Sequence, residues 1–190
     1  MLREMMLGPR RFSELRADLP GLSANTLSQR LAELEQRGLI VRRRLPPPAS
    51  VQVYEATEWG LEAEPIVQAL GRWAARSPRH DPTLPLSAVS ILLSFRTMIS
   101  EKRAKDFDGR IGFRFGAETY LARVRKGRIK VARDGLEQAD AIITAGPTTL
   151  AAVVYGGAPV ESIAIEGNQA LAGRFLTLFV LPPKVDVERH

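Results

Sequence analysis

The sequence contains no cysteine and only two histidines, His80 and His190. The absence of thiols excludes disulfide bonds, thiolate metal sites and thiol redox sensing. One histidine lies in a Pro-rich stretch and the other is the last residue. We therefore expect no histidine-based metal site or catalytic constellation.

Long apolar runs are also missing. No stretch reaches the roughly eighteen uncharged apolar residues of a membrane-spanning helix, so we expect no membrane span. The first residues, MLREMMLGP, lack the extended apolar segment of a signal peptide. These features favour a cytoplasmic protein.

Motifs for catalysis are absent as well. The sequence has no phosphate-binding loop, nucleophile elbow or metal-ligand spacing. Its clustered carboxylates flank expected turns, where such residues more often form the turn than an acid–base pair. They are Asp106, Asp108, Asp134, Glu137 and Asp140. We therefore do not expect an enzyme.

The chain does contain a helix-turn-helix pattern near its start. A first amphipathic helix ends at Pro20-Gly21, because proline lacks a donor and glycine tolerates the turn. Ser23 is a good N-cap for a second helix, and Gly38 is a good C-terminal stop. The apolar stripes are Phe12, Leu15 and Leu19 in the first helix and Leu27, Leu31 and Leu34 in the second.

The other face of the second helix is polar near its N-terminus, the end that meets the bases when such a helix enters the DNA major groove. Amides can bond adenine in bidentate fashion, arginine can bond guanine, and hydroxyls can bond a base or a phosphate. The candidate DNA contacts here are Ser23, Asn25, Thr26, Ser28, Gln29 and Arg30.

A basic hairpin follows the second helix. One strand carries three consecutive cations, Arg42, Arg43 and Arg44, and residues 51–56 return antiparallel. Three prolines lie at the tip, where no ladder hydrogen bond is needed. Residues 10–44 hold eight arginines against four carboxylates, so most of the chain's +6 charge is concentrated there. This excess favours phosphate contacts.

A simpler interpretation is a helical hairpin followed by a charged surface strand. Two amphipathic helices around Pro-Gly do not alone indicate DNA binding. The polar N-terminal face, the glycine stop and the arginine strand together favour the DNA-binding interpretation.

The stretch LGPRRFSELRADLPGLSANTLSQRLAELEQRGLIVRR, continuing to YEATEWGLEAEPIVQALGRWAAR, resembles the MarR-like winged-helix regulators of the HxlR type over about Leu7 to Arg76. The resemblance implies a bacterial transcriptional regulator that binds double-stranded DNA as a homodimer. It also implies that the helix from Ser23 to Arg37 is the recognition helix. Only Leu2 to Leu7 corresponds to the family's longer first helix, which is thus short or truncated here. Some regulators of this type resemble redox switches, which the lack of cysteine excludes.

Residues 58–75 read as one long amphipathic helix with a kink or short break at Pro65. Thr57 can cap it. In the family resembled, this helix contributes to dimerisation, and a plain core-covering helix is the alternative. Its apolar stripe is Leu61, Ile66, Leu70 and Trp73.

Three prolines between residues 77 and 85 predict a linker. The sequence therefore divides into a winged helix-turn-helix domain over 1–76, a Pro-rich linker over 77–85 and a second domain over 86–190.

The second domain reads as α+β with an antiparallel sheet. An apolar helix over 86–100 precedes strands around Phe113, Ala122, Val131 and Ile142, with a turn at Lys126-Gly127. Helices follow from Pro147 to about residue 155 and from about 168 to 179.

The runs ADAIITAGPTTLAAVVYGG and IAIEGNQALAGRFLTLF resemble the sterol-carrier-protein-type lipid-binding domain over about Leu86 to Leu181. That family encloses an apolar tunnel, so the resemblance implies a fatty-acyl, sterol-like or other hydrophobic small-molecule ligand. No other cofactor is implied. The alternative is that the same residues fill an ordinary core. The candidate ligand contacts are Phe113, Phe115, Leu150, Val154, Phe175, Leu176 and Phe179.

Together these features predict a DNA-binding regulator whose second domain binds a hydrophobic small-molecule effector. The alternative is a lipid or sterol carrier whose winged helix is a degenerate interaction module.

Overall fold

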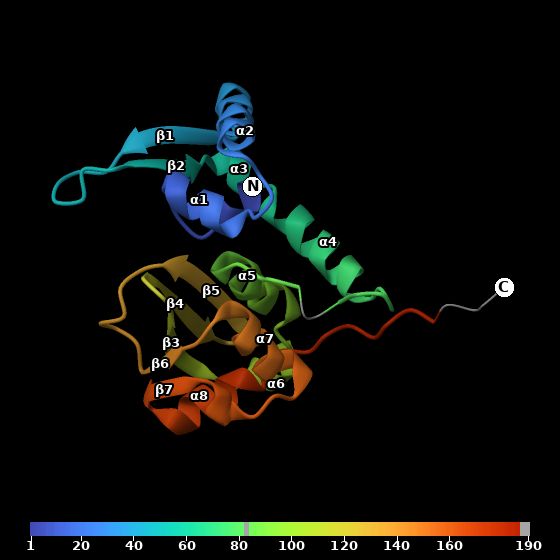
Figure 1. The fold of residues 1–190 in the computed structure, drawn as a ribbon. Coiled ribbons are helices and arrows are strands. Elements are labelled where there is room, and N and C mark those ends of the chain that lie inside the picture. Colours follow the sequence, from blue (N-terminus) through green and yellow to red (C-terminus); the bar gives the residue numbers. More distant parts are fainter. Residues whose placement is uncertain (82–83, 187–190) are drawn as a thin grey trace. The chain divides into compact units, whose positions relative to one another are not determined.

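The computed structural model describes residues 1–81 and 84–186 and divides into two compact units, residues 1–67 and the chain from Gln68 onward (Figure 1). Helix α4 (Glu64–Ala75) runs across this division. The linker over 77–85 and the domain limits at 76 and 86 stay predictions.

The first unit is a winged helix-turn-helix. Its two helices, the turn at Pro20-Gly21 and the antiparallel hairpin all lie where the sequence predicts them. The elements are, in chain order, the 3-10 helix η1 (Leu2–Met5), α1 (Phe12–Asp18), α2 (Ala24–Gln36), β1 (Ile40–Arg44), β2 (Gln52–Ala56) and α3 (Glu58–Leu61).

Local capping fixes the ends of these helices. The Ser23 hydroxyl accepts a hydrogen bond from the Thr26 backbone N–H at 3.1 Å, which satisfies one free donor of α2. Gly38 adopts a φ of 74°, a left-handed conformation that glycine tolerates, and ends the helix. The Thr57 hydroxyl accepts from the Gly60 N–H at 3.0 Å and donates to the Gly38 carbonyl at 2.7 Å. Thr57 therefore caps α3 and ties it to the end of α2.

The core of this unit joins η1, α1 and α2 to the two strands of the hairpin. Its members are apolar residues that are almost wholly buried: Met5, Leu15, Leu27, Leu31, Ile40, Tyr54 and Ala56. Short η1 contributes Met5 to this cluster although it has only four residues. Burial against tertiary partners stabilises a helix that would be marginal alone.

Gly60 lies where a side chain has no room. A Cβ at this position would be 2.1 Å from the Leu39 carbonyl oxygen, which is backbone and cannot swing away. We expect Gly60→Ala to destabilise the winged helix by about 2–3 kcal/mol, in the range of overpacking at tight sites. Thermal unfolding of the full chain measures this.

Gly71 supplies the matched control for that substitution. It lies in α4, and a Cβ there would meet nothing within 4 Å. Because alanine is the better helix former by about 0.5–1 kcal/mol, Gly71→Ala should raise stability slightly. Equal melting points for the two variants would contradict the packing described for Gly60.

The predicted helix over 58–75 is two helices, α3 and α4, with the break at residues 62–63. Pro65 therefore lies in the first turn of α4, where its missing N–H costs no hydrogen bond. The predicted apolar stripe does not cover a core. Ile66, Leu70 and Trp73 are 71%, 60% and 72% exposed, and Leu61 of α3 is 40% exposed.

The second unit is α+β, as predicted. Its sheet has the strand order β5-β4-β3-β6-β7. Its further elements in chain order are α5 (Ala88–Met98), α6 (Glu101–Ala104), β3 (Asp108–Phe115), β4 (Glu118–Arg125), β5 (Arg128–Arg133), β6 (Ala141–Thr144), α7 (Pro147–Gly156), η2 (Val160–Ser162), β7 (Ala164–Gly167) and α8 (Gln169–Leu176).

The sheet is mixed, whereas the sequence predicted an antiparallel one. β3, β4 and β5 form the expected antiparallel meander, but β6 pairs parallel to β3. The chain after β5 crosses the outer face of the sheet to reach the far side of β3. Gly112 permits this crossing, because a Cβ there would lie 2.8 Å from Leu136 and 3.0 Å from Ala139.

The end of the last helix and the presence of strand β7 differ from what the sequence predicts. The last helix ends at Leu176 rather than at about 179, since residues after it bond back to the end of α5: the Val180 N–H donates to the Met98 carbonyl at 2.9 Å. Residues 164–167, unassigned from the sequence, form strand β7 beside β6.

Asp140 anchors the end of the crossing segment. Its carboxylate accepts from the Arg110 backbone N–H at 2.8 Å and from the Arg110 guanidinium at 2.9 Å. These hydrogen bonds favour the charged form, so the pKa of Asp140 is lowered. The ion pair fixes the segment where β6 begins.

Candidate nucleic-acid interface

The exposed face of α2 carries the first group of candidate DNA contacts. Leu27 and Leu31 are buried on the opposite side, which turns Asn25, Ser28 and Gln29 outward. These three side chains are exposed near the N-terminal end of the helix. Amide and hydroxyl groups in this position can donate to and accept from base edges.

Two of the predicted contacts also have structural roles. The hydroxyls of Ser23 and Thr26 lie 2.8 Å apart in a hydrogen bond at the helix cap. The cap orients the free N–H groups of the first turn outward, which suits a phosphate oxygen. Arg30 is exposed and forms an ion pair with Glu33 at 2.7 Å. An exposed i,i+3 pair contributes only about 0.3–0.5 kcal/mol, so a base or phosphate can replace the carboxylate.

The three wing arginines lie together on β1 and are all exposed. Arg42 lies 3.6 Å from Glu35 of α2, and Arg43 forms an ion pair with Glu55 of β2. Arg44 donates from Nε to the Ser50 carbonyl at 3.1 Å. A surface hollow of about 380 Å³ is lined by Arg42, Arg43, Arg44, Ser50 and Gln52. The arginines therefore form a cationic surface around the hairpin, with Arg42 and Arg44 on one face and Arg43 on the other, and their partners are weak.

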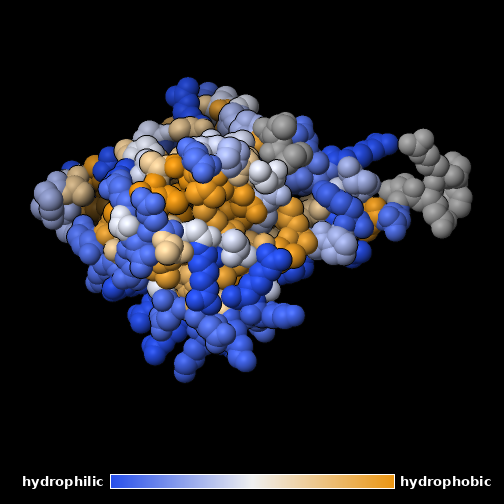
Figure 2. Space-filling model, turned by 90° about the horizontal axis from the view of Figure 1, so that it is seen from below, coloured by the Kyte–Doolittle hydropathy of each residue, from blue (hydrophilic) through white to orange (hydrophobic). Residues whose placement is uncertain are grey.

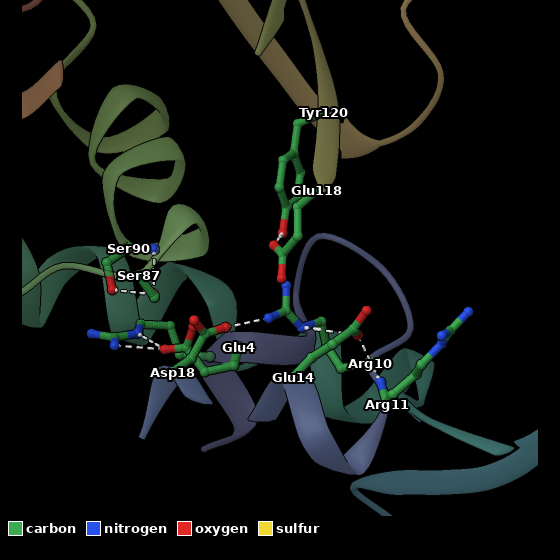
Figure 3. A network of polar contacts seen from close by, with 10 residues as sticks. Glu4, Arg10, Arg11, Glu14, Asp18, Ser87, Ser90, Glu118 and Tyr120 are labelled. Carbon is green, nitrogen blue, oxygen red and sulfur yellow. Dashed lines mark hydrogen bonds and ion pairs between the residues drawn. The ribbon is translucent and has the colours of Figure 1, made fainter. Parts of the chain in front are cut away.

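Arg10 behaves differently from the other arginines of this basic segment. It is 1% exposed and forms ion pairs with Asp18 and Glu14, the latter at 3.7 Å (Figure 3). Its backbone pairs with Tyr54 of β2 through two hydrogen bonds of 2.8 Å. Arg10 is thus a structural residue, and its charge does not add to the cationic surface. Sequence reasoning missed this role, although the carboxylates four and eight residues later are the signal for it.

The candidate ligand contacts of the second unit form one aromatic cluster. Phe113 and Phe175 are fully buried, with ring centroids 5.7 Å apart. Phe175 and Phe179 lie 5.0 Å apart in an edge-to-face arrangement, and Phe113 stacks on Phe115 at 6.0 Å. Leu150 and Leu176 are buried and Val154 is half-buried. The rings fill the space between sheet and helices, and a ligand cavity there stays a prediction.

Phe95 was absent from the predicted set and is the centre of this cluster. It stacks on Phe179 at 4.3 Å and lies 5.7 Å from Phe175 and 5.9 Å from Phe113. Its place on the apolar helix α5 was the available signal.

A polar pair borders the cluster. The hydroxyls of Ser94 and Tyr155 lie 2.9 Å apart, and the Tyr155 ring is 6.4 Å from Phe95. Burial raises the pKa of Tyr155, so its hydroxyl stays neutral at physiological pH. This pair can offer one hydrogen bond to an otherwise apolar molecule.

Apolar residues also gather on the surface of the second unit. Figure 2, which views the molecule from below, shows a broad hydrophobic area bordered by hydrophilic residues. Val160, Val180 and Leu181 are exposed large apolar residues of this unit.

Among residues 1–81 and 84–186, no group of His, Asp and Glu is arranged to hold a metal ion. No helix within the same residues is long and apolar enough to cross a membrane.

Comparison with known proteins gives separate results for the two halves. UbiJ-SCP2, a ubiquinone synthesis protein, matches 65% of this chain with a TM-score of 0.34 and 14% identity, over 93% of its own chain.

The family model of the HxlR-like helix-turn-helix matches residues 1–81. YvaP of Bacillus subtilis, an uncharacterized HTH-type transcriptional regulator, is 40% identical over 72 residues, which are 37% of this chain and 66% of YvaP. The reduced form of the transcriptional regulator YodB from B. subtilis is 32% identical, with a TM-score of 0.38, over 42% of this chain and 79% of that one. The chain spans about half to two thirds of the length of the curated relatives it matches. Through its winged helix, the chain belongs to the HxlR-type family of helix-turn-helix transcriptional regulators.

Proposed function

We propose that this protein is a cytoplasmic transcriptional regulator that binds a pseudo-palindromic operator as a homodimer. One observation carries the proposal: the exposed polar face of α2 and the cationic wing occur in one compact unit of the DNA-binding type. Such a protein acts by binding, so we assign it no reaction.

Each group of residues has a distinct role in this proposal. Asn25, Ser28, Gln29 and Arg30 read base edges in the major groove. Ser23, Thr26 and the first-turn amides hold a phosphate, and the wing arginines Arg42, Arg43 and Arg44 contact backbone or minor groove.

The experiment is a hydroxyl-radical footprint of the full chain on the DNA that flanks its own coding region. We expect two protected half-sites whose centres lie about one helical turn, roughly 10 base pairs, apart. Uniform weak protection along the fragment would overturn the regulator proposal.

The exposed face of α4 supports the homodimer. Ile66, Leu70 and Trp73 recur at helical spacing, and large exposed apolar patches mark interfaces. We expect the Leu70→Glu, Trp73→Glu double variant to be monomeric in sedimentation equilibrium where the unaltered chain is dimeric, because each buried carboxylate would cost several kcal/mol. Val160→Glu, at an exposed apolar residue outside this helix, is the control and should stay dimeric. A dimeric double variant would contradict this interface.

The second unit is the proposed sensor of a hydrophobic effector of the fatty-acyl or sterol-like class. The aromatic cluster and its Ser94–Tyr155 pair support this role, since hydrophobic ligand sites combine apolar walls with few polar groups. The effector changes DNA binding only to the extent that its affinity differs between the DNA-competent and the DNA-incompetent form of the protein. Native mass spectrometry with a panel of fatty acids and sterols tests it. An unchanged apo mass with every member would overturn the sensor role.

A further inference from the structure

The outer face of the second unit's sheet is strongly basic. Strand alternation places Ile111, Ala122 and Val131 on the buried face and the charged residues between them on the other. We call this outer surface the basic face. Its cations are Arg110, Arg114, Arg123, Arg125, Arg128 and Lys130.

Strand register aligns these cations in rows. Arg110, Arg123 and Lys130 lie directly opposite one another across β3, β4 and β5, and Arg125 lies opposite Arg128. Neighbouring strands are about 4.8 Å apart, so each row brings like charges close together. Like charges directly opposite destabilise a sheet, and an anion bound across them removes that cost.

Three of the six cations of the basic face already have carboxylate partners. Asp140 pairs with Arg110 at 2.9 Å, Glu166 with Arg114 at 2.7 Å, and Asp108 with Arg125 at 3.4 Å. Within residues 1–81 and 84–186, Arg123, Arg128 and Lys130 form no ion pair or hydrogen bond through their side chains. The uncompensated charge is thus concentrated on β4 and β5, away from the segment that crosses β3.

Protection of a sheet edge does not account for this pattern. Lysine and arginine on an edge strand discourage pairing with other chains, and β5 is an edge strand. Arg123 and Arg125, however, belong to β4, which is paired on both sides. Their cations have no edge to protect.

From this arrangement we infer that the basic face is a second, sequence-independent binding surface for the phosphate backbone of double-stranded DNA. The inference rests on the proposed function in one respect: DNA held by the winged helix is at high effective concentration for the covalently attached sheet. Five of the six cations are arginines, whose planar fork suits phosphate oxygens. No aromatic side chain lies among them on this face to enter a bilayer.

The test measures the salt dependence of duplex binding by the full chain and by the Arg123→Gln, Lys130→Gln double variant. Each lost phosphate contact lowers the slope of log affinity against log salt by about 0.9, so we expect a drop of about 1.8. The ratio of operator to random-duplex affinity should not change, because the loss of phosphate contacts weakens binding to all sequences alike.

The control is Lys102→Gln, Lys105→Gln, which removes two exposed lysines in and just after α6. Should the double variant lose its fold by circular dichroism, the single Arg123→Gln serves, with an expected drop of about 0.9.

The outcomes separate this inference from the proposed function. An unchanged slope in the double variant, with operator preference intact, overturns the inference alone. A second outcome combines two results: the double variant binds random duplex more weakly, and the unaltered chain shows no preference for the operator. This outcome supports the inference and overturns the regulator proposal. If the basic face binds phosphatidylserine vesicles but not duplex DNA, the inference that its partner is DNA is overturned.

Discussion

The Gln29→Ala, Arg30→Ala double variant should lose most of its preference for the operator. One bidentate contact to a base is worth about 1–3 kcal/mol of discrimination, so two such contacts correspond to at least about 30-fold in affinity. Random-duplex binding should fall only slightly, because it depends on the cations of the wing and the basic face. Fluorescence anisotropy with operator and random duplexes at one salt concentration measures both values.

The same helix provides a matched control. Gln36 and Arg37 repeat the two residue types seven positions later, on nearly the same side and about 10 Å further along the axis. Both are exposed. Since the N-terminal end of a recognition helix meets the bases, Gln36→Ala, Arg37→Ala should retain the operator preference. Equal losses in the two variants would contradict the assignment of the reading residues.

Phe175→Ala should be among the most destabilising single substitutions in the second unit. Phe175 is fully buried, and the centroid of its ring lies 5.0 to 6.2 Å from those of Phe95, Phe107, Phe113 and Phe179. Removing a buried phenylalanine ring costs about 3–5 kcal/mol, since the lost contacts leave a cavity. We expect a drop of roughly 10 °C or more in one calorimetric transition of the full chain.

This substitution also tests how tightly the aromatic cluster is packed when no ligand is bound. Val160→Ala, at a 42% exposed site, is the control and should change stability by less than about 0.5 kcal/mol. A loss below about 1 kcal/mol for Phe175→Ala would contradict the packed cluster and indicate that the site already contains free space.

Local signals made the first unit predictable. Pro20-Gly21, the Ser23 cap and the Gly38 stop act within a few residues of the chain, and the structure places helix ends at each. The hairpin was predictable because its strands are neighbours in sequence and are joined by one proline-rich turn.

Long-range pairing made the second unit harder to predict. The meander over β3, β4 and β5 joins neighbouring strands, whereas the parallel pairing of β6 with β3 depends on a crossing that Gly112 permits. A single glycine in a strand does not reveal which segment will pack on it.

The candidate site was predictable only where local signals determine it. An outward position on a helix follows from periodicity, which is why Asn25 and Gln29 lie on the exposed face. The rows of cations on the basic face, in contrast, depend on which strands meet, and composition does not specify that.

The central claim is that this chain reads a DNA sequence. Its most direct test is the ratio of affinities of the unaltered full chain for its footprinted operator and for a random duplex of equal length, at about 0.15 M salt. The account predicts a ratio of about 10³ or more, as for specific DNA-binding proteins. Equal affinities for the two duplexes would contradict it.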